Sequence, residues 1–571
     1  MKINVLDVSR FGNLTANYSD QLNQVSDRIR RDYITMVDDL SVTYDSDLHW
    51  FTTPFACRNT SVCSVFDEVT KFFFVKEVLS VDENIDTIVV DSPILAKVLR
   101  LNIENKNLTI LSQKSLTGYY VSLIFQVGLG LFKYVLASMF RYFSFKLAIL
   151  FAPNKVNNFE KKITIIETYI YKSSFKDGEF NDRHFFNIQS HLKEQDKQRV
   201  VYLPFFYGKI NYFSLYLKAI KSKFNFIFVE EYTSFMDIIL YPIKNIFKLK
   251  YNHSDINLYG VDFSKLVNHS IFRHSTKPSS LYSLLKYRFS TNLKKNRSIV
   301  INRIVRWYEN LEIDHGSIMG WRAYSPSLYI FGYMDLFVSK NYLSPYPSQV
   351  EYNLNIVPDS IGVIGEGLID QHKKFCHELN VVLAPSFRFS KPKLNIRKDR
   401  LEQETINILV SLPLSISRIR IIVDILENFV RLNCTRKVSF IVKLHPASDY
   451  VFNLANGENI EFNVVNTNFN QLVRNVDFVL SSASSTLVEA FMFGAYALVS
   501  SSTQELSDNT LPEFIPNDYW RAVYNAQELA DIVKHYTQKG VENREEISSI
   551  NAMIVGQPPN EKNVRTMLGF I

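Results

Sequence analysis

The sequence has few cysteines for its length, and they are not arranged as a metal site or a disulfide framework. Cys57, Cys63, Cys376 and Cys434 include no CxxC pair among 571 residues, and no histidine follows them at zinc-finger spacing. So sparse a set excludes a disulfide-stapled scaffold and favours a reducing compartment. The first residues, MKINVLDVSRFGN, also lack the basic start, apolar core and cleavage site of a secretory signal. We therefore expect the protein in the cytoplasm.

Concentrated charge of either sign is also missing. The chain has 64 Lys and Arg residues against 57 Asp and Glu residues, a net charge of +7, and no basic stripe. Because nucleic-acid-binding proteins concentrate basic charge on one face, we expect no nucleic-acid partner. The small positive surplus instead favours anionic lipid heads or an anionic substrate.

One segment lacks charge altogether. Tyr119–Phe132 reads YYVSLIFQVGLGLF, and apolar residues continue to Ala152 around Lys133, Arg141 and Lys146. A membrane-spanning helix needs about 20 mostly apolar residues, more than the uninterrupted run supplies. The aromatic content favours a helix in the membrane interface, with its basic residues reaching lipid phosphates. A helical hairpin buried against the N-terminal domain is the alternative.

The size and the pattern of the chain predict more than one α/β domain. At 571 residues, with 46% hydrophobic and 21% charged residues, the chain is too long for a single core. Short β-rich runs alternate with helical patterns, as in parallel sheets with crossover helices. Strands are predicted over residues 3–8, 87–90, 108–111, 163–169, 200–203 and 226–229, before a long helical stretch over residues 280–311. A second series covers residues 361–364, 381–384, 406–411, 438–444, 460–465, 478–481 and 497–500.

This pattern predicts an α/β fold of two Rossmann-like domains that face each other across a cleft. The N-terminal domain is expected over residues 1–355, with residues 119–152 as a helical apolar insertion. The C-terminal domain is expected over residues 356–545, and residues 546–571 form a tail that could pack back on the first domain. Ligands of such sheets bind at the carboxyl ends of the strands.

The first candidate motif stands at the end of a C-terminal strand. The segment FIVKLHPASDY carries Lys443, His445 and Pro446 at the carboxyl end of the predicted strand. A histidine there can donate a hydrogen bond to a phosphate oxygen or protonate a departing phosphate. Proline stiffens the turn that sets the direction of the ring.

The second candidate motif is a serine-rich turn between a strand and a helix. After the strand over residues 478–481, the helix LVEAFMFG follows a hydroxyl-rich turn made of Ser481, Ser482, Ser484, Ser485 and Thr486. Hydroxyls and unpaired backbone N–H groups at a helix start bind anions. Glu489 could close a capping box with Ser485 or Thr486, or bind a ribose hydroxyl. A capped helix without a ligand is the alternative.

An arginine follows a third strand on the same side. The segment VVLAPSFRFS places Arg388 just after residues 381–384. Its planar guanidinium suits a donor phosphate or the carboxylate of an acidic sugar. A surface ion pair is the alternative.

The His-Pro and serine-turn motifs, in this order and with a strand between them, resemble the donor domain of GT-B glycosyltransferases. The resemblance is to families that hold a cytidine nucleotide: bacterial sialyltransferases, polysialyltransferases, Kdo transferases and CDP-glycerol polymerising enzymes. It implies a CMP-linked sugar donor, no further cofactor and no metal.

A segment of the first half resembles bacterial surface-carbohydrate proteins of the retaining Kdo transferase type. The family elements are WYEN, an acidic residue, Gly-x-Arg, Gly-Tyr and Pro-Asp, which here are residues 307–310, Asp314, Gly320 with Arg322, Gly332 with Tyr333, and Pro358 with Asp359. Met334 and Asp335 stand where related enzymes often carry a histidine, so no acceptor-side histidine is carried over. We expect acceptor-side roles for the polar residues of this and two earlier patches, namely Arg58, Asn59, Asp182, Arg183, Asn310, Arg322 and Tyr333.

A retaining transfer by double displacement needs a nucleophilic carboxylate and a second group for the acceptor proton. We predict Glu309, at the end of the long helix, as nucleophile or charge stabiliser. Glu231, after the strand over residues 226–229, is the predicted acid/base, and His445 assists the leaving phosphate. Acidic residues at these positions could instead only cap the elements beside them.

The leading hypothesis is transfer of an acidic sugar, such as Kdo or a nonulosonic acid, from its CMP form to a lipopolysaccharide O-antigen or capsule. The acceptor would be a glycan or lipid-linked glycan, and the enzyme would lie peripherally at the inner membrane. One alternative keeps the fold but uses a nucleoside diphosphate sugar or CDP-glycerol, with Lys443 binding the second phosphate. Another is a non-catalytic scaffold of a polysaccharide assembly complex.

Overall fold

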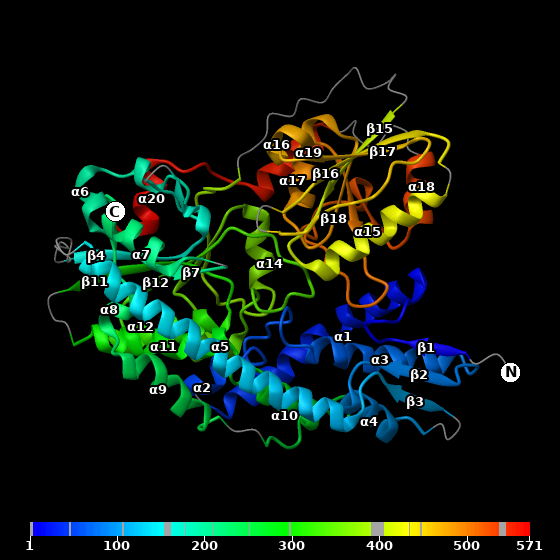
Figure 1. Cartoon of the computed structure of the whole chain (residues 1–571), viewed down its shortest axis with the longest axis horizontal. Coiled ribbons are helices and arrows are strands. Elements are labelled where there is room, and N and C mark those ends of the chain that lie inside the picture. The colour runs from blue at the N-terminus through cyan, green and yellow to red at the C-terminus, as the bar shows by residue number, and fades with distance from the viewer. Residues whose placement is uncertain are drawn as a thin grey trace.

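The computed structural model describes residues 4–571, apart from residues 45–46, 105–107, 153–161, 177–178, 209, 250–251, 296–298, 390–404, 433, 446–447 and 536–543. Three parallel sheets organise the described residues, one small and two large. Figure 1 shows the second large sheet, in yellow and orange, above the N-terminal unit in blue and beside the first large sheet in cyan and green.

The N-terminal unit is built on a three-stranded parallel sheet. Its strands are β1 (Val5–Asp7), β2 (Thr87–Val90) and β3 (Thr109–Ser112). The main helices around it are α1 (Ala16–Val42), α3 (Val65–Val81), α4 (Pro93–Asn102) and α10 (Ser264–His274), and a separate hydrophobic core joins them. Three predicted strands therefore form a small sheet of their own, because the chain leaves β3 through a 35-residue helix instead of a short crossover.

The first large sheet has seven parallel strands in the order β14-β13-β12-β11-β4-β7-β8. Their bounds are β4 (Lys162–Ile170), β7 (Val200–Phe206), β8 (Asn225–Phe226), β11 (Val300–Trp307), β12 (Tyr329–Met334), β13 (Ser360–Val363) and β14 (Val381–Leu383). Helices α7 (Tyr212–Lys221), α8 (Val229–Tyr232), α9 (Phe235–Ile246), α11 (Pro278–Leu293) and α12 (Glu312–Tyr324) belong to the same unit.

Two predictions about this half are wrong. The helix expected over residues 280–311 ends at Leu293, and β11 follows as the central strand between β12 and β4. Its β-branched residues gain cross-strand partners on both sides, which outweighs the helical pattern read from the sequence. The boundary expected at residue 355 is also displaced, because β13 and β14 pair with the first sheet. The change to the second sheet comes between Leu383 and Thr405.

The second large sheet has six parallel strands in the order β17-β16-β15-β18-β19-β20. Their bounds are β15 (Thr405–Ser411), β16 (Lys437–Lys443), β17 (Ile460–Val465), β18 (Phe478–Ser481), β19 (Tyr496–Ser500) and β20 (Trp520–Val523). Helices α15 (Ile416–Arg431) and α18 (Ala526–His535) pack together, and α17 (Thr486–Met492) follows β18. The predicted class is confirmed: two Rossmann-like parallel sheets form the GT-B arrangement.

The C-terminal tail lies against both large domains. Helix α19 (Arg544–Ile554) joins the second domain through Asn551, whose amide donates to the Met492 carbonyl at 3.0 Å. The chain then meets the first sheet, where the Gly556 N–H donates to the Ile364 carbonyl at 2.6 Å. Helix α20 (Glu561–Leu568) packs on β11, with the Arg303 guanidinium donating to two of its carbonyls. The tail therefore makes hydrogen bonds with both large domains.

The apolar segment forms a single helix, α5 (Leu116–Leu150), so the alternative of a helical hairpin is wrong. Figure 1 shows it in light blue along the outside of the first domain, from α10 to α7. By length and composition it could span a membrane, although a few of its residues are buried against the protein. These are Tyr119, Leu123, Tyr134, Ser138, Arg141, Phe145 and Ala148.

Candidate functional site

The two large domains meet through polar side chains at the carboxyl ends of their strands. Arg388 follows β14 of the first domain, and its guanidinium donates to the hydroxyl of Ser485 in the second domain at 3.3 Å. Ser485 is the residue before α17. We call this region the junction, and define it by Arg183, Asp335, Arg388, His445, Ser485 and Glu489.

Asp335 supplies a buried carboxyl group from the first domain. It follows β12 and has no exposed surface. The Tyr333 hydroxyl donates to its Oδ2 at 3.2 Å, whereas its Oδ1 has no hydrogen-bond partner among the described residues. Burial raises the pKa of Asp335 to about 7, although the Arg388 charge acts in the opposite direction.

Glu489 supplies the matching carboxyl group from the second domain. It lies one turn into α17. Burial raises its pKa to about 7; the Arg388 charge opposes this rise, and the Asp335 charge adds to it. The charge of one guanidinium therefore acts on two carboxyl groups from different domains, and near neutral pH each of them can hold or release a proton.

The imidazole of His445 lies among positive charges. It follows β16 and is half-buried. Its pKa is lowered by burial and by the charges of Arg183, Arg388 and Lys443. A ring in this environment is neutral at pH 7, and a bound anion would favour its protonated form. Lys443 itself donates to the Thr467 carbonyl at 2.8 Å. Pro446 lies outside the described residues.

The residues of the serine turn differ in burial: Ser481 and Ser482 are buried, whereas Ser484, Ser485 and Thr486 are partly exposed. Ser481 is buried and donates to the Ser411 carbonyl at 2.7 Å. The hydroxyls of Ser484 and Thr486 lie 2.9 Å apart, and Ser482 is buried with no partner among the described residues. A capping box between Ser485 and Glu489, one of the alternatives considered, does not form, because Ser485 makes no side-chain bond to a backbone N–H of α17. Its hydroxyl hydrogen-bonds the Glu489 carboxyl instead.

Glu309 lies at the carboxyl end of the first sheet, directly after β11 and not at the end of a helix. The Trp307 indole donates to its Oε1 at 2.8 Å, and the Tyr342 hydroxyl donates to its Oε2 at 3.2 Å. Burial raises the pKa of Glu309. The His184 ring lies on Trp307, with 3.8 Å between ring centroids.

The segment 182–184 brings further polar groups to this side of the sheet. Asp182 is buried, and its Oδ1 accepts from the His184 N–H at 2.8 Å and from the Thr168 hydroxyl at 3.0 Å. Its Oδ2 has no partner among the described residues, and burial raises the pKa of Asp182 to about 6. Arg183 is exposed, with its guanidinium 5.4 Å from the Tyr171 ring centre. Burial and nearby arginine charge lower the pKa of His184 to about 3.

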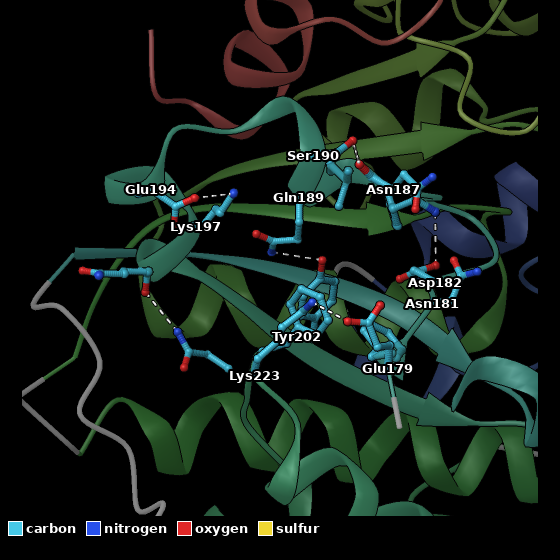
Figure 2. Close-up of a pocket in the computed structure, with 16 residues that line it drawn as sticks. Glu179, Asn181, Asp182, Asn187, Gln189, Ser190, Glu194, Lys197, Tyr202 and Lys223 are labelled. Carbon is cyan, nitrogen blue, oxygen red and sulfur yellow. Dashed lines mark hydrogen bonds and ion pairs between the residues drawn. The ribbon is translucent and has the colours of Figure 1, made fainter. Parts of the chain in front are cut away.

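A pocket of about 570 Å³ lies beside Asp182, between the segment 179–198 and strands β7 and β8. Figure 2 shows polar side chains around it from several elements. Amide groups are supplied by Asn181, Asn187, Gln189, Gln198 and Asn225, and aromatic surface by Phe180, Phe185, Tyr202 and Phe224. The Gln189 amide donates to the Tyr202 hydroxyl at 3.2 Å.

Three predicted acceptor-side residues lie in a buried network, where each of them binds a carboxylate of the protein. Arg58 is 1% exposed and pairs with the carboxylates of Glu351 and Asp38. Asn59 donates to Glu312 at 3.0 Å, and Asn310 donates to Glu351 at 3.2 Å. Because their polar atoms bind one another between the N-terminal unit and the first sheet, their expected acceptor roles are wrong.

Two further predicted residues lie away from the junction. Arg322 pairs with Asp359 at 3.0 Å, just before β13, so it lies at the amino ends of the strands. Parallel strands place that edge opposite the junction. Glu231 lies in the short helix α8, which packs against α5 and α11. The expected strand over residues 226–229 is only β8, at the outer edge of the sheet. The acid/base role predicted for Glu231 does not fit this position.

Tyr333 is buried as well, but it organises the junction. Its hydroxyl donates to the Pro385 carbonyl at 2.9 Å and to Asp335, while the Phe387 N–H donates to it at 3.4 Å. Tyr333 therefore fixes both Asp335 and the loop that carries Arg388. Sequence reasoning missed Asp335 as a functional candidate, although its position right after a strand was a usable signal.

Within the part of the chain that the structure describes, no three His, Cys, Asp or Glu side chains group as a metal site.

The architecture and the junction define a protein of GT-B fold. No family model and no curated protein matches the sequence. Solved structures of similar fold include an Anabaena protein in complex with UDP-glucose (11% identity, TM-score 0.37), covering 72% of this chain and 99% of that one. The glycosyltransferase SnogD from Streptomyces nogalater (10%, TM-score 0.38) covers 72% and 100%. Arabidopsis thaliana UGT89C1 (10%, TM-score 0.38) covers 72% and 99%. Similarity at this level does not identify a substrate.

Proposed function

We propose that this protein is a glycosyltransferase that binds a nucleotide-activated sugar at the junction. The observation that carries the proposal is the convergence of Arg388, Asp335, Ser485 and Glu489 from two domains. A site shared by two domains can hold a donor on one side and an acceptor on the other. It also supplies both a cation for a departing phosphate and carboxyl groups for a proton.

The proposed donor is the CMP form of an acidic sugar, of the Kdo or nonulosonic acid type. Such a donor carries two anionic groups, one phosphate and one sugar carboxylate. The charges of Arg183, Arg388 and Lys443 all act on His445, so a dianionic ligand would find a positively charged environment there. Arg388 is the best placed to bind two oxygens at once. No metal and no further cofactor is part of this proposal.

Asp335 replaces Glu231 as the proposed acid/base. In a retaining transfer, Glu309 attacks the anomeric carbon, and the bond to the phosphate oxygen breaks as CMP leaves with the electron pair. The acceptor hydroxyl then displaces Glu309 and passes its proton to Asp335. His445 and Arg388 stabilise the charge on the departing phosphate. The pKa of Asp335, about 7, matches this role near neutral pH.

The proposed acceptor site is the pocket beside Asp182. Planar amides next to aromatic rings suit a sugar, because hydroxyls bind the amides while the ring stacks on aromatic surface. Asp182 lines this pocket, and its Oδ2 has no hydrogen-bond partner among the described residues. The acceptor in this proposal is a glycan or lipid-linked glycan of a bacterial surface polysaccharide, at the cytoplasmic face of the inner membrane.

A nucleotide panel tests the donor. We expect CMP to raise the melting temperature more than CDP or UDP does, because one phosphate fills the site. Preference for CDP or UDP would favour a nucleoside diphosphate sugar or CDP-glycerol donor. Binding of none of them would favour a non-catalytic scaffold. Transfer is then measured with CMP-Kdo and CMP-neuraminic acid, and failure with every activated sugar that binds would overturn the proposed reaction.

A further inference from the structure

The outward face of α5 is apolar along its whole length. Twelve large apolar side chains of this helix are exposed: Leu116, Tyr120, Val121, Ile124, Phe125, Phe132, Leu136, Met139, Phe140, Phe143, Leu147 and Leu150. Their spacing of three or four residues places them on one side of the helix. At 1.5 Å per residue the helix is about 50 Å long. Soluble monomers rarely expose a continuous apolar surface of that extent.

The opposite face holds α5 against the protein from end to end. Near its start, Arg273 of α10 lies over the Tyr119 ring at 5.2 Å. In the middle, the Tyr134 hydroxyl donates to the Ile238 carbonyl of α9 at 2.8 Å. Near its end, the Phe145 ring meets Tyr216 of α7 at 5.4 Å. A helix held in this way cannot cross a bilayer without breaking all of these contacts.

Helix α9 extends the apolar surface beside α5. The ring of Phe235 meets Phe143 of α5 at 5.8 Å between centroids. Met236 is 59% exposed, and Phe247, just after the helix, is 83% exposed. The surface is therefore wider than a single helix.

The charges on these helices have one predominant sign. Helices α5, α7 and α9 together contain six basic residues and one acidic residue, Asp237, which pairs with Arg288 at 2.8 Å. Lys133 and Lys146 are the exposed charged residues of α5, and they flank its apolar stripe. Lysines beside an apolar stripe extend their amines to lipid phosphates.

We propose that the outward face of α5, widened by α9, lies in the interface of a membrane that contains anionic phospholipid. A second copy of the chain fits less well, because two such faces would bring lysines together without carboxylates to pair with them. The proposal rests only on the exposed apolar side chains and the charges of this surface, so it does not depend on the proposed transfer reaction. It would hold the domains at the membrane without a spanning segment.

Vesicle flotation with the full chain tests the proposal. We expect binding to vesicles of phosphatidylcholine with 30% phosphatidylglycerol, and weaker binding to phosphatidylcholine alone. The variant F125E/F140E should bind these vesicles more weakly, by roughly tenfold or more. The matched control is L414E/I416E, which places the same charges on exposed apolar residues of the second domain and should bind like the parent. Circular dichroism and the melting temperature establish that each variant is folded.

Two further measurements separate the competing explanations. K133Q/K146Q should lose the preference for anionic lipid while retaining weak binding. Phe132→Trp should be quenched by brominated lipid, because that position faces the acyl chains at shallow depth. Unchanged binding of folded F125E/F140E would overturn the proposal. The proposal would also be overturned if the parent protein bound no vesicles and was a dimer in light scattering, and if F125E/F140E was a monomer.

Discussion

The carboxyl groups of Asp335 and Glu489 come from different domains, and the charge of the Arg388 guanidinium acts on both. The pKa values of the two carboxyl groups therefore depend on how the two large domains meet. Because removing or neutralising one group changes the other two, each variant needs separate measurements of ligand binding, transfer and stability.

Arg388→Ala should weaken nucleotide binding about tenfold to a hundredfold, the loss expected for one charge-assisted hydrogen bond of about 1.5–3 kcal/mol. Titration calorimetry with CMP measures the effect. Arg322→Ala is the matched control, because that arginine pairs with Asp359 at the opposite edge of the sheet. Equal loss of affinity in both variants would count against Arg388 as a phosphate ligand.

Asp335→Asn should change how stability depends on pH. A carboxyl group whose pKa is raised to about 7 in the folded state keeps its proton between about pH 4 and 7, whereas the unfolded chain releases it. The folded state then binds more protons, so this group makes the free energy of unfolding fall as pH rises through that window. In urea unfolding, the variant should gain stability relative to the parent at pH 8 and differ little from it at pH 4.

The same substitution should slow transfer by about 10²–10⁴-fold, the usual contribution of a positioned general base. For the parent, the rate should increase with pH through about 7 as Asp335 loses its proton. This rise should disappear in Asp335→Asn. An unchanged pH–rate profile in that variant would assign the proton to another group, for which Glu489 is the next candidate.

Glu309→Gln should slow the chemical step and leave CMP affinity nearly unchanged, because the amide still fills the space between Trp307 and Tyr342. Single-turnover kinetics beside calorimetry separate the two quantities. Parental turnover in this variant would remove Glu309 from the mechanism.

His445→Ala should abolish transfer while the melting temperature stays near that of the parent. The ring is half-buried at the end of β16, so its removal leaves no large cavity in a core. An activity assay with the CMP-sugar, beside thermal unfolding, measures both properties. A strongly active variant would show that the departing phosphate needs no imidazole.

Arg58→Ala should destabilise the fold by about 3–5 kcal/mol, because it leaves the buried carboxylate of Glu351 without its partner. Urea unfolding measures this loss. The protein that remains folded should bind CMP with the parental affinity, since Arg58 belongs to the buried network and not to the junction. A specific loss of CMP affinity in the folded variant would contradict the assignment of Arg58 to the buried network alone.

The rule that ligands bind at the carboxyl ends of parallel strands was enough to select Arg388 and His445 from the sequence, because strand patterns are local and each residue lies in the loop after a strand. The prediction of Glu309 rests instead on the end of an expected helix, where the structure has β11. The same rule applied to Asp335 would have added the missing carboxyl group. The sequence pattern also marked α5 by the uncharged, apolar run over Tyr119–Phe132.

Which polar residues face the junction and which turn inward depends on contacts between residues far apart in the sequence. Arg58 meets Glu351 across 293 residues of sequence, and Arg388 meets Ser485 across 97. Strand and helix patterns depend on neighbours a few residues apart, whereas a buried ion pair depends on the packing of whole domains. For this reason the α/β class and the strand ends that carry Arg388 and His445 could be predicted from local sequence patterns. The partner of each charge, and the domain to which β13 and β14 belong, were settled only by long-range packing.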